Sequence, residues 1–228
     1  SSTSRGLGDV YKRQILDRFN QIHPKILLYS EIYLYGGKKI NIKEKIKAVF
    51  GKIKSAKLLI RINYPDSSQE ESSEIKDLNS IYDGEIKTKE IKYEICKFND
   101  PMYILYSSGT TGKPKCIVHN TGGPLIQHMK EQQLHCDLKK DNKIFYFTTC
   151  GWMMWNWLIS SVASQATIIL YDGSPFFPEK DSLIKIADTE ALDIFGISAK
   201  YIDALRNENI QITNRSVSYT HLTLPTKA

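Results

Sequence analysis

The sequence has no apolar run that approaches the roughly 20 residues needed to cross a lipid bilayer. It also has no basic start followed by an apolar core, which is the pattern of a secretion signal. Cysteine is scarce, and no zinc or redox spacing fits the four that occur, Cys96, Cys116, Cys136 and Cys150. We therefore expect no membrane span and a cytoplasmic protein whose thiols stay reduced.

The sequence also lacks a concentrated basic patch, although its net charge is +6. Part of the excess lies in the two ends, and the other lysines are scattered among isoleucine and asparagine residues. Proteins that bind nucleic acids usually gather their cations on one face or along one helix. We therefore expect no nucleic-acid partner. A hydrophobic content of 41% instead indicates an ordinary globular protein.

Both ends of the chain differ in character from the part between them. Residues 1–14 (SSTSRGLGDVYKRQ) and 215–228 show no periodicity that continues into the neighbouring segments. We expect both to be non-native tails and exclude them from the fold prediction. The native sequence then lies in residues 15–214.

Between these ends, helical and strand patterns alternate along the chain. A helical face from Ile15 to Ile22 ends before Pro24, and Gly36-Gly37 between two alternating arms indicates a hairpin. Repeated strand–helix units predict an α/β fold with a mostly parallel sheet flanked by helices. Residues 66–79 are rich in serine and glutamate and can bury little apolar area, so we predict a surface loop there.

Residues 106–115 (YSSGTTGKPK) form a polar stretch between two apolar runs. Its glycines permit backbone conformations that other residues avoid, so successive N–H groups can converge on an anion. The hydroxyl groups add donors and the lysines add positive charge. Because a polyphosphate uses all of these groups, the sequence predicts a phosphate-binding loop made of Ser107, Ser108, Gly109, Thr110, Thr111, Gly112, Lys113 and Lys115.

The P-loop of ATPases and kinases is one alternative for this stretch. Its pattern, G-x-x-x-x-G-K-[ST], needs wider spacing between its glycines and a helix that begins at once. Here Gly109 and Gly112 are too close, Lys113 precedes a proline, and the following CIVH has strand character. The spacing argues against a P-loop. A purely structural loop is the other alternative, and the paired hydroxyls and lysines argue against it.

Residues 104–115 (ILYSSGTTGKPK) resemble the AMP-binding signature of adenylate-forming enzymes, which include acyl-CoA synthetases, luciferases and peptide-synthetase adenylation domains. The resemblance implies the large N-terminal domain of such an enzyme, with a loop that holds the β- and γ-phosphates of ATP. It also implies that a carboxylate attacks the α-phosphorus and that the resulting acyl-adenylate passes its acyl group to CoA. ATP, Mg²⁺ and CoA are the cofactors it implies.

A second distinctive stretch, residues 148–157 (TTCGWMMWNW), is rich in tryptophan and methionine. A buried helix face accounts for Trp152, Trp155 and Leu158 but leaves Asn156 unexplained. In the adenylate-forming family this segment helps to wall the acyl pocket. The resemblance therefore implies a pocket for a short acid, built from Trp152, Met153, Trp155 and Asn156.

The wider pattern narrows the acid further. The sequence after the loop (CIVHNTGG and LIQH), together with GWMMWNW and LYDGSP, resembles ligases that activate acetoacetate. The expected partners are therefore small molecules: acetoacetate, ATP and CoA. Acetate, propionate or another short acid is the alternative, because pocket shape sets this discrimination.

The histidines raise a metal-site hypothesis. His128 and His135 could share a helix face, but no recognised ligand spacing accompanies them or His119, so we predict no metal site. By the resemblance, the adenine-binding and ribose-binding motifs and the catalytic lysine of a small C-terminal domain fall outside this sequence. We expect the catalytic residues to lie elsewhere in the parent enzyme, and this part alone to be an inactive nucleotide-binding fragment.

Overall fold

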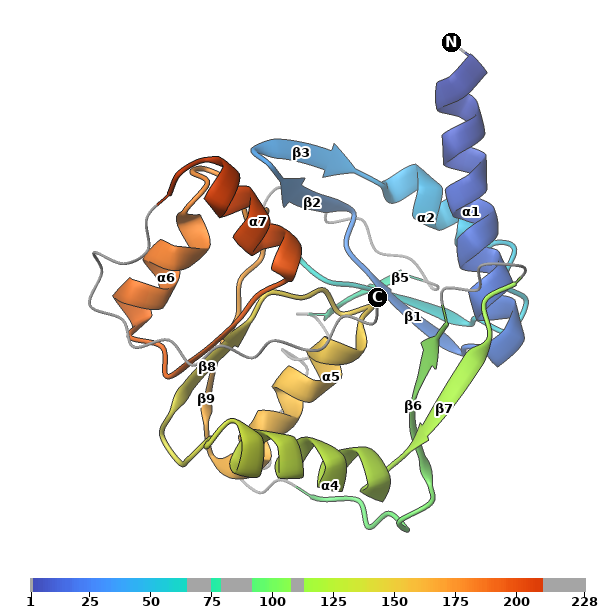
Figure 1. Ribbon diagram of the computed structural model, residues 1–228. Helices are drawn as coiled ribbons and strands as arrows, with labels where there is room; N and C mark the ends of the chain where they lie inside the picture. The colour runs from blue at the N-terminus through green and yellow to red at the C-terminus, as the bar shows by residue number, and fades with distance from the viewer. Residues whose placement is uncertain (1, 65–74, 79–91, 108–112, 211–228) are drawn as a thin grey trace. The chain divides into compact units, whose positions relative to one another are not determined.

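A computed structural model of the chain describes residues 2–64, 75–78, 92–107 and 113–210, with side chains from residue 12 onward (Figure 1). These residues divide between two compact units. The first unit comprises residues 1–95 and 106–117, and the second comprises residues 96–105 and 118–228. No helix in the described ranges combines the length and the apolar character that crossing a lipid bilayer requires.

The first unit contains a three-stranded parallel sheet in which β4 lies between β1 and β5. Among the described residues of this unit, the buried apolar side chains are Tyr29, Ile32, Val49, Ile53 and Leu59. Its elements follow in the order α1 (Ser2–Ile22), β1 (Ile26–Tyr29), β2 (Ile32–Tyr35), β3 (Lys38–Asn41), α2 (Lys43–Phe50), β4 (Leu58–Arg61) and β5 (Ile75–Asp77).

The glycine pair joins β2 and β3 in the predicted hairpin. The strands are antiparallel, with Tyr35 opposite Lys38. Gly36 and Gly37 both have positive φ angles, 56° and 74°. A two-residue turn between twisted strands favours this conformation, and glycine adopts it without a steric cost. The hairpin prediction is confirmed.

Two local predictions for the first unit differ from the structure. Helix α1 begins at Ser2, well before the predicted helical face at Ile15. Part of the predicted surface loop is strand β5, which pairs with β4. The loop prediction is wrong there because the composition of residues 66–79 carries no sign of the pairing: the Asp77 carboxylate accepts a hydrogen bond from the buried Arg61 guanidinium at 3.0 Å.

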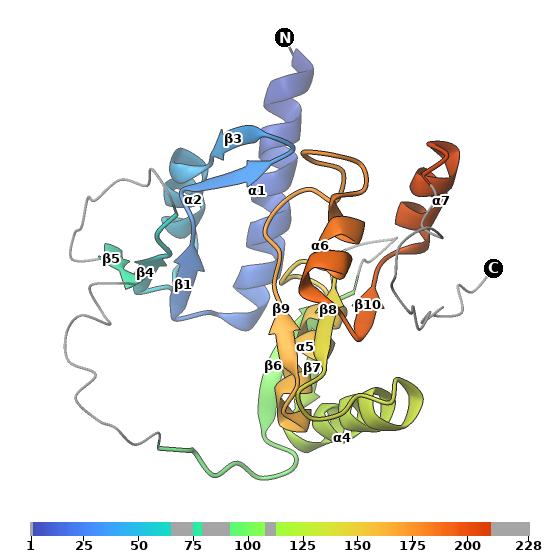
Figure 2. The same cartoon turned by 90° about the vertical axis from the view of Figure 1, so that its left-hand side faces the viewer.

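The second unit contains another three-stranded parallel sheet, with β8 between β10 and β9 (Figure 2). Strands β6 and β7, which flank the predicted phosphate loop, pair with each other. The elements from β6 onward are β6 (Pro101–Tyr106), β7 (Cys116–Asn120), α4 (Gly122–Lys130), a π-helical turn (Glu131–His135), β8 (Lys143–Tyr146), α5 (Met153–Ser160), a 3₁₀ turn (Ser161–Ser164), β9 (Thr167–Ile169), α6 (Ser182–Glu190), β10 (Ile194–Gly196) and α7 (Ala199–Asn207).

Helices cover both faces of this second sheet. Successive strand residues point to opposite faces, so Ile144 and Phe145 of β8 enter different cores. Ile144 packs with Trp157 and Leu158 of α5. Phe145 packs with residues of α6 and α7, including Leu183. Figure 1 shows α5 on one side of β8 and β9 and α6 and α7 on the other. The predicted α/β fold is confirmed, with the parallel strands divided between two sheets.

Candidate functional site

Hydrogen bonds between residues 107 and 115 close the base of the predicted phosphate loop, and this base is called the neck below. The Ser107 N–H donates a hydrogen bond to the Lys115 carbonyl at 3.0 Å, and the Lys115 N–H donates to the Ser107 hydroxyl oxygen at 3.2 Å. Residues 107 and 115 thus extend the pairing of β6 with β7, and the loop leaves and returns at one place. Lys113 and Lys115 are exposed. The predicted members Ser108, Gly109, Thr110, Thr111 and Gly112 lie outside the described residues.

Helix α1 contacts both sides of this neck. The Tyr106 hydroxyl donates to the Arg18 carbonyl at 3.2 Å, and the Arg18 guanidinium lies 5.9 Å from the centre of the Tyr106 ring. On the other side, the Gln21 amide donates to the Pro114 carbonyl at 3.0 Å. Burial raises the pKa of Tyr106, so its hydroxyl remains a donor at neutral pH. Sequence reasoning missed these contacts because they join residues 88 and 93 positions apart.

The tryptophan-rich stretch does not form the buried helix face that was the alternative to an acyl pocket. Helix α5 begins at Met153, so Trp152 lies before it on extended backbone and its side chain is 68% exposed. Trp157 and Leu158 are the buried residues of this helix. The Trp157 indole N–H donates to the Glu131 carboxylate at 3.0 Å, which satisfies its polar atom. The alternative of a buried face made of Trp152, Trp155 and Leu158 therefore does not hold, because Trp152 precedes the helix.

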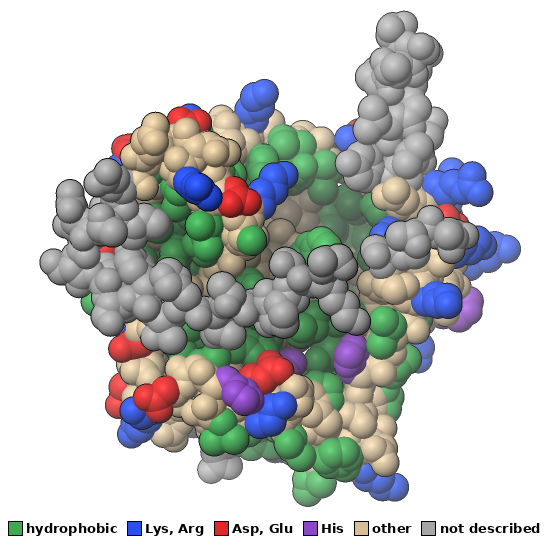
Figure 3. Space-filling model, in the orientation of Figure 1, with side chains coloured by type: hydrophobic (Ala, Val, Ile, Leu, Met, Phe, Trp, Pro, Cys, Tyr) green, Lys and Arg blue, Asp and Glu red, His purple; other side chains and the backbone are tan. Residues whose placement is uncertain are grey.

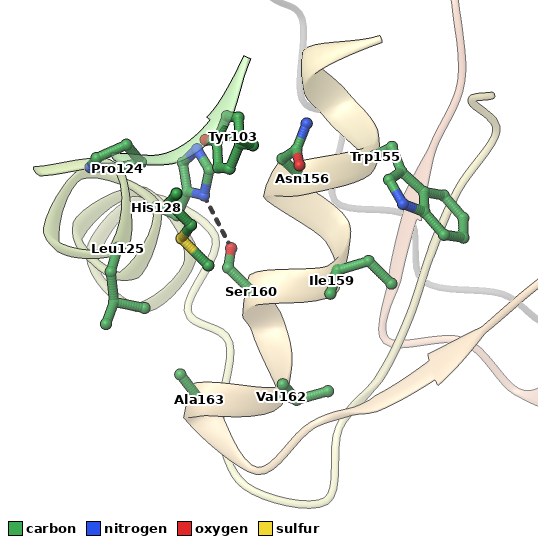
Figure 4. A pocket seen from close by; sticks show the side chains of 11 residues that line it. Tyr103, Pro124, Leu125, His128, Trp155, Asn156, Ile159, Ser160, Val162 and Ala163 are labelled. Carbon is green, nitrogen blue, oxygen red and sulfur yellow. Dashed lines mark hydrogen bonds between the residues drawn. The ribbon is translucent and has the colours of Figure 1, made fainter. Parts of the chain in front are cut away.

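A cavity of about 270 Å³ lies between α4 and α5 in the second unit (Figure 4). Two of the four residues predicted for the acyl pocket line it, Trp155 and Asn156. A second cavity, of about 420 Å³, shares Tyr103, Pro124 and His128 with the first and is lined by Met153 as well. The remaining walls of the first cavity come from Met102, Leu125, Ile159, Ser160, Val162 and Ala163.

Three of the four predicted pocket residues thus surround two adjoining cavities, and the exposed Trp152 lines neither of them. Apolar side chains also reach the surface beside this region. Leu125 and Ile126 of α4 are 40% and 61% exposed. In the space-filling view, hydrophobic side chains gather on the surface over α4 (Figure 3).

A buried histidine that sequence reasoning did not assign to the pocket stands between the two cavities. His128 is 6% exposed, and its Nδ1 atom lies 2.9 Å from the Ser160 hydroxyl oxygen. That hydroxyl has one proton, which it donates to the Trp157 carbonyl at 2.7 Å. A proton on Nδ1 of His128 satisfies both contacts, because Ser160 then accepts from the ring and donates to the carbonyl. The other ring nitrogen, Nε2, is then a hydrogen-bond acceptor.

The ring of His128 is uncharged at neutral pH. Burial lowers the pKa of His128, and the nearby His119 lowers it further, while the Glu131 carboxylate acts in the opposite direction. The Glu131 carboxylate already accepts hydrogen bonds from Trp157 and Gln127. Lysine and arginine are absent from the described lining of both cavities. The region therefore combines apolar walls with neutral polar groups.

Two further polar side chains line the first cavity. The Tyr103 ring stacks on His119, with ring centres 4.9 Å apart, and burial raises the pKa of its hydroxyl. Asn156 lies on α5, across the cavity from Tyr103 and His128 (Figure 4). Neither the Tyr103 hydroxyl nor the Asn156 amide has a hydrogen-bond partner within the described part of the chain. Both side chains are half-buried.

The described residues contain no cluster of three or more His, Cys, Asp or Glu side chains that could hold a metal ion. Of the histidines raised by the sequence, His128 is engaged with Ser160 and His119 with Tyr103. The exposed His135 ends the π-helical turn. The buried ring of His128 and the half-buried ring of His119 are thus held by a hydrogen bond and by ring stacking.

Comparison with known proteins shows which family the chain belongs to. The sequence model of the family described as "AMP-binding enzyme" matches residues 10–223. Acetoacetyl-coenzyme A synthetase of Rhizobium meliloti (strain 1021) is 43% identical over 200 residues, which cover 87% of this chain and 30% of that protein. Malonamoyl-CoA synthetase vrtB of Penicillium aethiopicum is 35% identical over 228 residues, covering 92% of this chain and 31% of that protein.

A solved structure agrees with the sequence comparisons. Acetoacetyl-CoA synthetase from Streptomyces lividans matches with a TM-score of 0.82 at 36% sequence identity, over 89% of this chain and 31% of that one. The similarity therefore extends over most of the chain. The chain itself spans only about a third of the length of the relatives it matches.

Proposed function

Because the chain belongs to the AMP-binding enzyme family, we propose that it is part of an acid–thiol ligase that activates acetoacetate with ATP and transfers it to CoA. In the first step, a carboxylate oxygen of the acid bonds to the α-phosphorus of ATP, and pyrophosphate leaves. In the second step, the CoA sulfur bonds to the acyl carbon, the thiol proton passes to solvent, and AMP leaves. The products are acetoacetyl-CoA, AMP and pyrophosphate.

The observation that carries this proposal is the complete signature at residues 104–115 on a neck closed by hydrogen bonds. Residues 107–115 place hydroxyls, N–H groups and lysines close together in the sequence. Hydrogen-bond donors and cations around a phosphoryl group stabilise the charge that develops on it during transfer. We assign the β- and γ-phosphates of ATP to residues 107–113 and Lys115, with Lys113 and Lys115 supplying positive charge.

We assign the acid to the neighbourhood of Trp155, Asn156 and Met153, which line the adjoining cavities. Cavities of about 270 and 420 Å³ are large enough for a short acid. The names of the relatives support the same size class, since acetoacetyl and malonamoyl groups are both short. Acetate, propionate or another short acid is the alternative substrate.

Mg²⁺ would accompany the ATP, since it shares the negative charge of the phosphates in phosphoryl transfer. Mg²⁺ usually keeps several waters and binds substrate phosphates together with one or two carboxylates. The chain's own contribution is the positive charge of its two lysines.

Since the chain spans about a third of its relatives, we assign the complete reaction to a longer protein that contains residues 15–214 as part of its AMP-binding domain. For the chain alone, a second function fits the same observation: a nucleotide-binding part without catalysis. ATP–pyrophosphate exchange with acetoacetate separates the two. We expect exchange from the complete protein, and we expect ATP binding without exchange from this chain.

Two results would count against these assignments. Acetoacetate-dependent exchange by the 228-residue chain would overturn its assignment as non-catalytic. Failure of the complete protein to exchange pyrophosphate with any short acid would overturn the ligase itself. If acetate or propionate supports pyrophosphate exchange at least as well as acetoacetate, the ligase assignment is retained and the substrate is the alternative short acid.

A further inference from the structure

We propose that helix α1 positions Lys115 for phosphate binding, and that Gln21 is the positioning residue. This inference rests on the proposed function, in which Lys115 supplies positive charge to the phosphates of ATP. It assigns a role in nucleotide binding to a side chain that precedes Pro114 by 93 residues.

The peptide group that joins Pro114 to Lys115 is held at both of its polar atoms. Its carbonyl oxygen accepts a hydrogen bond from the Gln21 amide at 3.0 Å. Its N–H donates to the Ser107 hydroxyl oxygen at 3.2 Å. The next carbonyl, that of Lys115, accepts from the Ser107 N–H at 3.0 Å. Hydrogen bonds therefore hold the backbone on both sides of the Lys115 Cα atom.

A held backbone decides where the lysine side chain begins. Because peptide groups are planar, the Cα–Cβ bond of Lys115 has a set direction once the groups before and after it are held. Pro114 restricts the chain further, since its ring locks φ at about −65°. A lysine ammonium is a point charge on a flexible stem, so a fixed start of the stem narrows the volume that the charge can reach.

Gln21 is itself held in place on α1. Its amide nitrogen also donates to the Asp17 carbonyl, one helical turn earlier. A side-chain amide has two N–H donors, so both hydrogen bonds form at once. The bond within the helix restricts the rotation of the side chain and leaves the second N–H for Pro114.

The same face of α1 also contacts the strand that enters the loop. Arg18 and Gln21 are three residues apart and are therefore neighbours on the helix surface. The Arg18 carbonyl accepts from the Tyr106 hydroxyl, and the Arg18 guanidinium lies within cation–π range of the Tyr106 ring. Helix α1 and residues 106–117 belong to one compact unit. One helix face thus contacts Tyr106 before the loop and Pro114 after it.

The test compares ATP binding by the 228-residue chain and its variants in calorimetric titrations. Gln21→Met keeps the length of the side chain and removes the donor to Pro114. It should raise the Kd for ATP about fivefold, the effect of losing one ordinary hydrogen bond. Gln14→Met is the matched control, because Gln14 is exposed on α1 about two turns before Gln21. The control should leave the Kd unchanged, and both variants should unfold at the same urea concentration as the unaltered chain.

A double change separates positioning from general support of the fold. If Gln21 acts through Lys115, Gln21→Met should have no further effect on the Kd once Lys115 is replaced by alanine. A general loss of stability would instead weaken binding by the same factor in both backgrounds.

Amide hydrogen exchange provides a readout that needs no nucleotide. The Lys115 N–H should exchange faster in Gln21→Met than in the unaltered chain, because its peptide group is then held at one atom instead of two. Gln14→Met should leave this exchange rate unchanged.

Three results would overturn the positioning role: an unchanged Kd in Gln21→Met, a loss of affinity that persists in the Lys115→Ala background, or an unchanged exchange rate of the Lys115 amide. If the unaltered chain does not bind ATP, the nucleotide part of the proposed function is wrong. The exchange rate then still decides whether α1 holds the peptide group before Lys115.

Discussion

The Nδ1 atom of His128 lies 2.9 Å from the hydroxyl oxygen of Ser160, 32 residues later in the chain. This contact joins α4 to the last residue of α5. The Gln132 amide donates to the same hydroxyl oxygen at 3.3 Å and to the Trp157 carbonyl at 2.6 Å. The two helices are thus held together by a buried polar network beside the cavity that both of them line. The geometry of that cavity depends on the network.

Replacement of Ser160 by alanine should change the tautomer of His128. The Nδ1 proton loses its acceptor, so the alternative neutral form with the proton on Nε2 becomes populated. Loss of one buried hydrogen bond should also lower the free energy of unfolding by about 1–3 kcal/mol. Long-range nitrogen–proton NMR of the histidine rings distinguishes the two tautomers directly. Ser164→Ala is the control, since Ser164 accepts from Gln133 and does not touch His128. An Nε2-protonated ring in the unaltered chain would contradict the assignment.

The stability of the chain should fall in mild acid because of His128. Its pKa is lower in the folded state than the unfolded value of about 6.5, so the unfolded state binds the proton more tightly. The stabilisation is complete above the unfolded pKa and is lost as the pH falls from there through the folded pKa. Urea unfolding at about pH 7.5 and about pH 5.5 measures this difference. His128→Gln should reduce it, whereas His135→Gln, at an exposed position, should not. Equal pH dependence in both variants would show that other groups cause it.

The sequence predicts the parts of the site that are continuous along the chain, and it misses the parts that packing brings together. The spacing of Gly109 and Gly112 with the following lysines led to the prediction of a phosphate loop, which stays a prediction because residues 108–112 lie outside the described residues. Nothing local pairs Tyr103 with His128, because they meet only when β6 and α4 line one cavity. The helical spacing of the tryptophans likewise does not show where α5 begins. The helix starts at Met153, one residue after Trp152, so Trp152 is not on the helical face.

Gly196 should tolerate no side chain. A Cβ atom at this position would lie 2.1 Å from the Tyr146 ring, which covers the glycine from the neighbouring strand β8. Gly196→Ala should lower the free energy of unfolding by about 1–3 kcal/mol, the usual cost of overpacking. Gly151→Ala is the control, since nothing lies within 4 Å of a Cβ there. If the strain comes from the ring, Tyr146→Ala combined with Gly196→Ala should cost less than the sum of the two single changes. Strict additivity would contradict this cause.

Arg61 should be among the most sensitive positions of the first unit. Its side chain is 1% exposed and forms ion pairs with Asp77 at 3.0 Å and with Glu31 at 3.7 Å. Arg61→Ala would leave both carboxylates without this partner, and breaking a buried pair usually costs about 3–5 kcal/mol. Chemical denaturation measures the loss. The exposed pair of Lys139 with Asp137 provides the comparison, because Lys139→Ala should change the stability by less than about 1 kcal/mol. Similar effects of the two changes would show that Arg61 is not structurally important.

The role of Lys115 in phosphate binding can be measured on the chain itself. Its backbone closes the neck of the loop and its side chain is exposed, so Lys115→Ala removes a positive charge and keeps the hydrogen bonds made by N–H and C=O. A charge-assisted hydrogen bond contributes roughly 1.5–3 kcal/mol, so the Kd for ATP should rise about tenfold or more. Lys140→Ala removes the same charge from an exposed position outside the loop and should leave the Kd within about twofold, which isolates the local contact from the change in net charge. Titration with ATP at two salt concentrations gives both values. Equal Kd values for the two variants would remove Lys115 from the phosphate site and leave Lys113 as its cation.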